Sequence, residues 1–244
     1  MRRLIVFVSK YENSLDGAKK IKNESEFHVE IIGIEKFCES NEYDIIEKDD
    51  IIFFLCASPL IHEVAVNLND KGCRIINKEY FLSNYTKKEI QIFLEKNNII
   101  IPKLYIENII NNNSFPIFCK ENMHTGITLQ LYNRNTQDKF FGRFDHKDFY
   151  LEEPVEIKNS REIKVYCVSG EVFYKNTQEQ NNIMINDICQ KVIEIFNNIE
   201  VCSIDFIYND EEFYLIDFNP SSGFYATDKG RKGFINYCEK IVNR

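Results

Sequence analysis

Short apolar runs alternate with helical patterns in the first 80 residues, and this alternation restricts the fold more than any other feature. The runs are "RLIVFVS" (3–9), "FHVEIIGI" (27–34), "DIIFFLCA" (50–57) and "CRIIN" (73–77). Between the last two, Leu60, Ile61, Val64, Ala65 and Leu68 follow helical spacing, and Gly72 closes the segment. Because strands joined by helices form parallel sheets with right-handed crossovers, we predict an α/β domain over residues 1–80.

Strand patterns dominate the remainder of the chain. Thr86 is a predicted helix N-cap, and Glu89 completes a capping box three residues later. We predict one hairpin with Gly170 in its turn and a second that turns at Asn209 and Asp210. Other predicted strands are "PKLYI", "FPIFCK", "GITLQLY" and "FYLEEPVE", and further helices are predicted at 182–198 and 229–242. Strand runs followed by helices indicate an α+β half after the α/β half.

Composition excludes several classes of protein. The 244 residues are 44% hydrophobic, which supports a sizeable core, but no apolar run approaches the roughly 20 residues of a membrane helix. The apolar run at the N-terminus is too short for a secretory signal. Eight cysteines without a CxxC pair are typical of reduced, buried thiols, so we expect a cytoplasmic protein. A net charge of −8 argues against nonspecific nucleic-acid binding, which needs a basic surface.

Three oxygen-bearing side chains lie in the stretch "VCSIDFIYNDEEFYLIDFN" (201–219). Asp217 and Asn219 are two residues apart on a predicted strand, so they share a face. A turn near residues 209–211 brings Asp205 close to the level of Asp217 on the neighbouring strand. Such a set suits a hard cation such as Mg²⁺, while a solvated hairpin face explains the same residues. The sequence chemistry leaves both readings open.

Two lysines are candidates for binding a phosphate. Lys87 lies in the first turn of a predicted helix, where the helix dipole disfavours a cation. Lys120 ends the strand "FPIFCK", where it either extends to the surface or faces an anion. In "EEPVE", Pro154 interrupts the strand and leaves backbone groups of Glu153 and Val155 without ladder partners.

Taken in order, these pieces resemble the ATP-grasp superfamily. The similarity covers about residues 50–244. It rests on "GCRIINK", the lysine-headed helix running into "IIIP", "FPIFCK", "LEEPV", "REIKVYCVSG" and "SIDFIY…YLIDFNPSSGF". The resemblance implies an α/β and α+β chain with a preATP-grasp α/β domain at 1–80 and an ATP-grasp domain at 81–244. The latter would have a central lobe at about 84–152 and a C-terminal lobe at about 153–244.

The resemblance also implies ATP and Mg²⁺, with two ions the usual number, as cofactors. Lys87 and Lys120 would contact the nucleotide phosphates. Glu152, Glu153 and Val155 would form the adenine hinge, with backbone groups of residues 153 and 155 reading the base edge. Asp205, Asp217 and Asn219 would hold the metal.

Two branches of the superfamily compete for the chemistry. One contains the RimK-like and glutathione-synthetase-like ligases, which phosphorylate a carboxylate with ATP and pass the acyl group to an amine. The other contains the inositol-polyphosphate kinases. The segment "FPIFCKENMHTG" resembles the strand-end lysine and nearby histidine of these kinases. The chain is acidic, and it has few candidates for a basic pocket beyond Lys164, Lys175, Arg231 and Lys232. Because a polyphosphorylated substrate would need such a pocket, we favour the ligase, acting on an amino acid, peptide or related molecule.

Four residues are candidates for contacts with the substrate or acyl phosphate: His124, Lys164, Arg231 and Lys232. Two departures from the superfamily pattern favour a third hypothesis, a nucleotide-binding module without turnover. The loop "ENMHTGIT" has a single glycine, Gly126, and the chain passes through "NTQEQNN" almost directly into a helix. The predicted partners are the carboxylate and amine substrates, with no nucleic acid or membrane. Either a monomer or a homodimer is compatible with this prediction.

Overall fold

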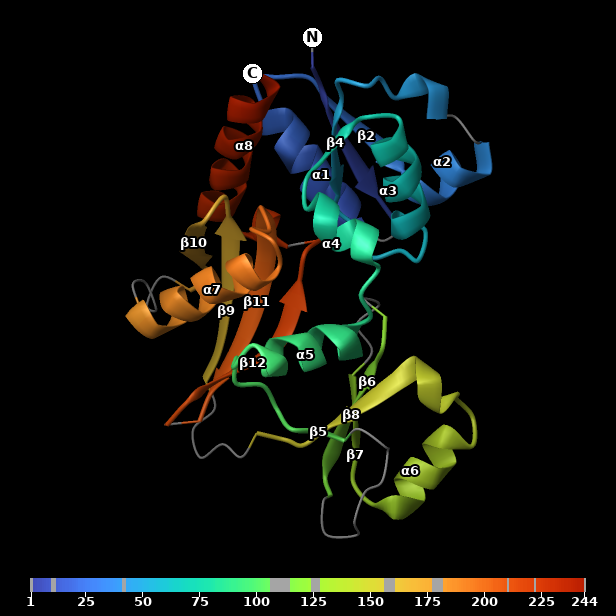
Figure 1. The fold of residues 1–244 in the computed structure, drawn as a ribbon, viewed down its shortest axis with the longest axis vertical. Helices are drawn as coiled ribbons and strands as arrows, with labels where there is room; N and C mark the ends of the chain where they lie inside the picture. The colour runs from blue at the N-terminus through green and yellow to red at the C-terminus, as the bar shows by residue number, and fades with distance from the viewer. Residues whose placement is uncertain are drawn as a thin grey trace. The chain divides into compact units, whose positions relative to one another are not determined.

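The structure is a computed structural model, shown in Figure 1. It describes residues 2–9, 12–40, 43–105, 115–123, 128–155, 161–176, 182–209, 211–221 and 223–243. His124 and Gly126, and most of the "NTQEQNN" segment, lie outside these residues.

The N-terminal part forms a parallel sheet, as its alternating pattern predicts. Its strands are β1 (Leu4–Val8), β2 (Val29–Gly33), β3 (Ile51–Phe54) and β4 (Arg74–Ile75). They lie in the order β2-β1-β3-β4, and Leu4 of β1 pairs with Val29 on one side and Ile51 on the other. The connecting helices are α1 (Glu12–Glu24), α2 (Ile34–Ser40) and α3 (Ile61–Asp70), and α4 (Lys78–Ser83) follows β4. A short 3-10 helix, η1 (Tyr43–Ile45), precedes β3.

A second sheet has the strand order β10-β9-β11-β12. The strands are β9 (Arg161–Val168), β10 (Glu171–Tyr174), β11 (Val201–Tyr208) and β12 (Phe213–Asn219). The predicted β9–β10 hairpin is confirmed, with both turn residues, Ser169 (φ 51°) and Gly170 (φ 84°), in the left-handed region that such a tight turn requires. Helix α7 (Ile183–Ile195) connects β10 to β11, and η4 (Phe224–Ala226) and α8 (Asp228–Val242) follow β12.

The third sheet is antiparallel, in the order β5-β8-β6-β7. Its strands are β5 (Leu104–Tyr105), β6 (Ile117–Glu121), β7 (Thr128–Leu131) and β8 (Phe149–Glu152). Helix α5 (Lys87–Lys96) has the predicted capping box between Thr86 and Glu89. Helix α6 (Arg134–Phe141) and the 3-10 helix η2 (His146–Asp148), between β7 and β8, were not predicted. The signal for α6 was the capping box of Asn133 and Thr136.

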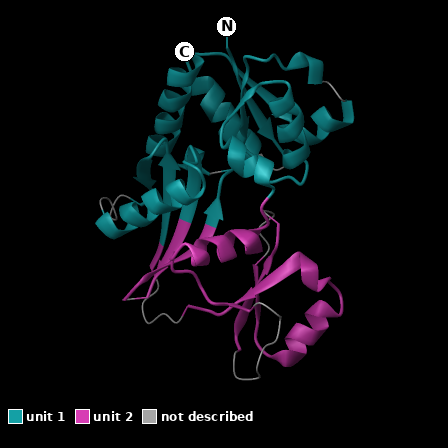
Figure 2. Ribbon diagram, in the orientation of Figure 1, with its two compact units in different colours: residues 1–84, 163–204, 218–244 teal, residues 85–162, 205–217 magenta. Residues whose placement is uncertain are grey.

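Two compact units divide the chain differently from the predicted domains. The first combines residues 1–84, 163–204 and 218–244, and the second combines 85–162 and 205–217. In Figure 2 the strands β9, β11 and β12 change colour along their length, because the division falls within them. The predicted limits at residues 80, 152 and 153 stay predictions about functional lobes.

Each unit has its own apolar core. In the first unit, Phe53 of β3 packs against Phe224 and against Phe234 of α8, and all three side chains are fully buried. The second unit has a smaller core around Ile117 and Leu151 of neighbouring strands. All eight cysteines are free thiols, and seven of them are buried. Within the described ranges, no helix has the length and apolar character needed to cross a membrane.

Candidate nucleotide site

A cavity of about 300 Å³ lies in the second unit, between its antiparallel sheet and the residues of β11 and β12 that belong to it. Six of the predicted site residues line it: Lys87, Lys120, Glu152, Glu153, Val155 and Asp217. These residues come from α5, β6, the end of β8 and β12, which are far apart in sequence. The structure therefore brings both predicted phosphate-binding lysines, the predicted hinge and one predicted metal ligand to one cavity.

Lys120 is held in this cavity by two acceptors. Its Nζ lies 2.6 Å from Glu152 Oε2 and donates a hydrogen bond of 2.9 Å to the carbonyl of Ile216. An ammonium group has three donors, so one N–H remains after these two contacts. The predicted alternative, in which Lys120 extends into solvent, is not what the structure shows, because only 16% of the side chain is exposed. Lys120 is placed as a fixed cation with a donor to spare.

Glu152 is a buried carboxylate with one oxygen free. Its exposed fraction is 1%, and Oε1 has no hydrogen-bond partner among the described residues. Burial raises the pKa of this carboxyl, although the nearby Lys120 charge lowers it. Tyr150, two residues earlier on the same face of β8, has its phenol pKa raised by burial and by the charges of Glu152 and Asp217. A buried polar atom without a partner is costly, so Oε1 marks a place where a ligand donor would be stabilising.

Lys87 forms an ion pair with Asp217. Its Nζ lies 2.9 Å from Asp217 Oδ1, and the exposed fractions of the two side chains are 15% and 33%. The start of α5 is anchored to the end of β6, because Asn122 accepts from the backbone N–H of Lys87 at 3.2 Å and of Lys88 at 3.0 Å. The helix dipole disfavours a cation at this end of α5, and the Asp217 carboxylate compensates for that cost.

The hydrogen bonds of the segment after β8 limit which backbone groups of the predicted hinge could contact a nucleotide. The backbone N–H of Glu153 donates to the carbonyl of Lys103 at 2.9 Å, which extends the β5–β8 ladder. The Glu153 and Lys103 side chains also lie 3.2 Å apart, as an exposed pair. Because its N–H is already bonded, the backbone of Glu153 can offer a ligand only its carbonyl oxygen. Pro154 has no N–H, so Val155, which lines the cavity, provides the next donor.

The predicted metal ligands lie on two neighbouring strands. Asp205 is on β11, and Asp217 and Asn219 are on β12, where residues two apart share a face. Asn219 Oδ1 accepts a hydrogen bond of 2.9 Å from the N–H of Ser221, and its second lone pair remains. Among the described residues, no group of three or more His, Cys, Asp or Glu is arranged to hold a metal. The predicted set has two carboxylates and one amide, a donor chemistry that suits Mg²⁺.

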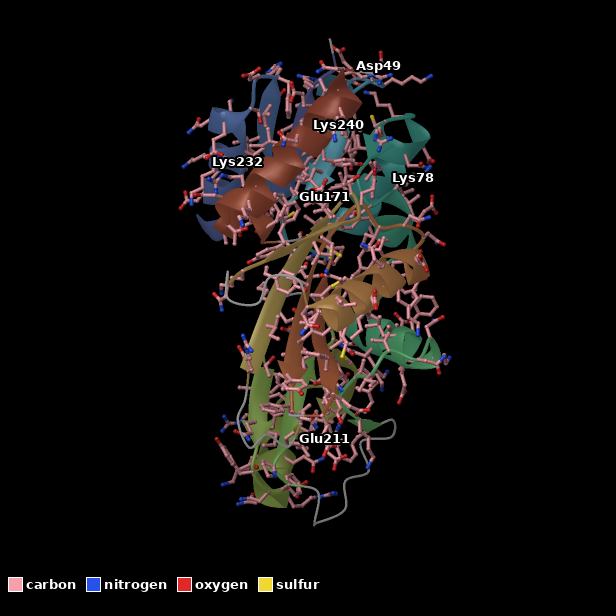
Figure 3. All side chains as sticks on the ribbon, turned by 90° about the vertical axis from the view of Figure 1, so that its left-hand side faces the viewer. Asp49, Lys78, Glu171, Glu211, Lys232 and Lys240 are labelled. Atoms are coloured by element: carbon pink, nitrogen blue, oxygen red, sulfur yellow. The ribbon has the colours of Figure 1, made fainter. Side chains whose placement is uncertain are left out.

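The other predicted substrate-binding residues belong to the first unit. Arg231, on α8, is 8% exposed and its guanidinium contacts Glu24, Asp228 and the carbonyl of Tyr225. Lys232, the next residue on α8, is exposed (Figure 3). Lys164 lies on β9, where it is partly exposed and its carbonyl accepts from the N–H of Lys175. Their predicted roles stay predictions.

Sequence reasoning missed several residues that line the cavity. Apolar contacts come from Pro102, Phe118, Ile207 and Ile216, and polar ones from Glu121, Thr128 and Glu162. The apolar residues match predicted strands, so their alternation could have indicated a shared face. Glu162 is two residues before Lys164 on β9 and on the same face, a spacing that could have identified it as a further candidate.

The chain is similar to known proteins in fold, but its sequence similarity to them is low. No protein-family model matches the chain, and no curated protein matches it. Solved structures do match. D-alanine–D-alanine ligase from Helicobacter pylori has a TM-score of 0.71 at 15% identity, covering 100% of this chain and 98% of that one. D-alanine–D-alanine ligase from Bacillus anthracis, complexed with ATP, has a TM-score of 0.67 at 12% identity, with coverages of 99% and 98%.

The ATP-grasp ligase PsnB, complexed with minimal precursor, Mg and ADP, is similar to this chain with a TM-score of 0.67 at 10% identity, covering 99% of this chain and 98% of that one. The fold prediction from the sequence is therefore confirmed: the chain has the ATP-grasp fold.

Proposed function

We propose that this protein is an ATP- and Mg²⁺-dependent carboxylate–amine ligase that acts through an acyl phosphate. The observation that carries the proposal is the cavity in which Lys87, Lys120 and Asp217 meet beside a buried carboxylate. It is supported by similar structures that are named as ligases, one of them complexed with ATP and another with ADP and Mg.

The apolar part of the cavity suits a purine base. Phe118, Ile207 and Ile216 offer apolar surface, and the volume of about 300 Å³ is at the lower end for small-molecule sites. The carbonyl of Glu153 would accept from the exocyclic amine of adenine, and the N–H of Val155 would donate to the ring. Oε1 of Glu152, which has no partner in the described part of the chain, offers one more acceptor for that amine.

The polar part suits a triphosphate. Lys120 would direct its remaining donor at the phosphates, and Lys87 would do the same on leaving Asp217. Asp205, Asp217 and Asn219 would hold Mg²⁺, which would supply neutralisation of phosphate charge. Phosphoryl transfer depends on positioning and charge neutralisation rather than on a covalent contribution from the protein. Two lysines and a set of metal-binding oxygens are the types of residue that this chemistry needs.

The proposed reaction has two steps. A substrate carboxylate oxygen attacks the γ-phosphorus, and the bond to the β–γ bridging oxygen breaks to release ADP. The nitrogen of an amine then attacks the acyl carbon, the carbon–oxygen bond to phosphate breaks, and the amine loses a proton. The product is an amide, and the substrates are an amino acid, a peptide or a related small molecule.

We also propose a cytoplasmic location, in keeping with the free thiols.

Hydroxylamine trapping tests this proposal. Purified protein is incubated with ATP, Mg²⁺, hydroxylamine and a panel of amino acids and peptides, and hydroxamates are detected by mass spectrometry. ATP-dependent hydroxamate formation that is lost in Asp217→Ala supports the ligase. A phosphorylated alcohol as the product would instead establish the kinase alternative, and ATP binding without any turnover would establish a nucleotide-binding module.

A further inference from the structure

Asn77 is a buried polar residue that lies in the first unit, outside the nucleotide cavity. It precedes α4 in a left-handed backbone conformation (φ 62°, ψ 32°) and is 4% exposed. Asparagine tolerates this conformation better than most residues. Its position at the start of a helix would ordinarily make it an N-cap, yet its side chain makes no capping hydrogen bond. The amide is used elsewhere.

The Asn77 amide makes four hydrogen bonds to distant backbone groups. Oδ1 accepts from the N–H of Glu200 at 2.9 Å and of Val201 at 3.0 Å. Nδ2 donates to the carbonyl of Val201 at 2.6 Å and to that of Pro220 at 3.0 Å. The carbonyl oxygen and the NH₂ group thus each make the two bonds of which they are capable. One side chain therefore joins the start of β11 to the residue after β12.

Pro220 directly follows Asn219, the amide in the predicted metal set. Asn219 Oδ1 accepts from the N–H of Ser221 at 2.9 Å, which closes a turn over Pro220. The Pro220 carbonyl within this turn is held by Asn77. The peptide group between Pro220 and Ser221 is therefore held at both ends, its N–H by Asn219 and its carbonyl by Asn77, and the Asn219 side chain is left with one free lone pair in a defined place.

We propose that Asn77 is a positioning residue for Asn219. By holding the Pro220 carbonyl, it keeps the turn at 219–221 in the conformation in which the Asn219 oxygen can bind Mg²⁺ beside a nucleotide. This inference rests on the proposed function. Asn77 contacts neither metal nor nucleotide, and its effect passes through one hydrogen bond to the backbone.

The side-chain chemistry distinguishes this role from general support of the fold. The two bonds that Oδ1 accepts hold β11, and an aspartate could accept the same bonds. The bonds that Nδ2 donates need an N–H group, which aspartate lacks. Asn77→Asp thus keeps the left-handed backbone and the acceptors but removes the hydrogen bonds to the carbonyls of Pro220 and Val201. Asn84 is a matched control, since it is also left-handed (φ 52°) but exposed.

The experiment measures Mg²⁺-dependent binding of ADP by calorimetry in the full-length protein. For Asn77→Asp we expect the Mg²⁺ concentration for half-maximal ADP binding to rise about tenfold, and exchange of the Ser221 amide to accelerate without nucleotide. Asn84→Asp should change neither. Val64→Ala, a buried substitution on α3, serves as a control for lowered stability and should leave the Mg²⁺ dependence unchanged.

Each outcome has a distinct meaning. If wild-type protein shows no Mg²⁺-dependent ADP binding, the proposed function fails. If the wild type binds but Asn77→Asp has the same Mg²⁺ dependence and Ser221 exchange as Asn84→Asp, the inference about Asn77 is wrong. If Asn77→Asp does not fold, the wild type is tested by NMR. The Asn77 side-chain NH₂ resonance should then shift on adding Mg²⁺ to the ADP complex, and an unchanged resonance overturns the proposal.

Discussion

Lys120 in the second unit and Arg231 in the first unit are both cationic side chains with little exposure, and both are predicted from sequence to contact ligands. Arg231 is surrounded by acceptors: its Nε contacts both carboxylate oxygens of Glu24 at 2.9 and 2.8 Å, and its other nitrogens contact Tyr225 and Asp228. Lys120 contacts Glu152 and one carbonyl, and beside it Glu152 Oε1 has no partner within the described residues.

The surroundings of these two cations indicate different roles. Each of the three guanidinium nitrogens of Arg231 contacts an acceptor within the protein, and its Glu24 partner is 38% exposed, so we infer that this network stabilises the fold. The Lys120 pair differs because Glu152 Oε1 is a buried acceptor that has no partner among the described residues, and because Lys120 and Glu152 both line a cavity. Since unsatisfied buried polar atoms cost roughly 1–3 kcal/mol each, they are expected mainly where a ligand satisfies them. The following predictions test this distinction.

Lys120→Met should have the largest effect. We expect turnover of ATP to fall roughly 10²- to 10³-fold, as is typical when a preorganised donor to transition-state charge is removed. The variant also leaves Glu152 without its cation, so stability should fall. Lys120→Met combined with Glu152→Gln should recover stability, measured by urea unfolding, but not turnover. Recovery of both would show that Lys120 is a structural residue like Arg231.

Arg231→Met should show the opposite pattern. Loss of its charged hydrogen bonds is expected to lower the free energy of unfolding by about 2–4 kcal/mol, with Mg·ADP affinity changed less than about twofold. The neighbouring exposed Lys232→Met is the control, with an expected change within about 0.5 kcal/mol. An Arg231→Met variant with unchanged stability and lost activity would support the predicted substrate role and contradict the comparison.

Lys87→Met should give an intermediate result. Because its pair with Asp217 is partly exposed, the loss in unfolding free energy should stay below about 1 kcal/mol. Nucleotide affinity, measured by calorimetry, should fall about tenfold, since one cation facing the phosphates is lost. Lys88→Met, on the same turn of α5, should have little effect. Equal losses in the two variants would indicate a general charge effect instead of a directed contact.

Glu89→Gln should have the smallest effect, which concerns the pH dependence of stability. The pKa of Glu89 is shifted in the opposite direction to that of Glu152. Hydrogen bonds from the Thr86 backbone and hydroxyl lower the pKa of Glu89, whereas burial raises that of Glu152. Because the folded pKa of Glu89 is depressed, its contribution to stability is present above the usual value of 4.5 and is lost as pH falls through the folded pKa. Between about pH 6 and pH 3, wild type should lose slightly more thermal stability than Glu89→Gln. Parallel pH curves for the two proteins would contradict this.

Most of the secondary structure could be predicted because its signals are local. The buried strand β1, the capping box of α5 and the Gly170 turn each depend on a few consecutive residues. Helix α6 also has a local signal in the Asn133 and Thr136 capping box, but this signal lies between segments with strand patterns. The short α4 has no side-chain cap at Asn77, so nothing nearby indicates where it begins.

The candidate site was predictable in part. The order of motifs identified six residues that the structure gathers around one cavity. Glu162 was missed, although its spacing from Lys164 was visible. That the Glu153 N–H is bonded to Lys103 could not be predicted, because that bond depends on the pairing of β5 with β8.

The sequence alone was enough to predict the strands, the helices α3, α5, α7 and α8, the alternation that makes the first sheet parallel, and which residue types could bind phosphate and metal. These follow from periodicity, capping and side-chain chemistry, which act over a few residues. Only the tertiary structure decided how each buried polar group is satisfied. Arg231 found its partners in Glu24 and Asp228, Asn77 reached Pro220, and Glu152 kept one oxygen without a partner in the described chain, since such contacts join segments whose proximity no local pattern encodes.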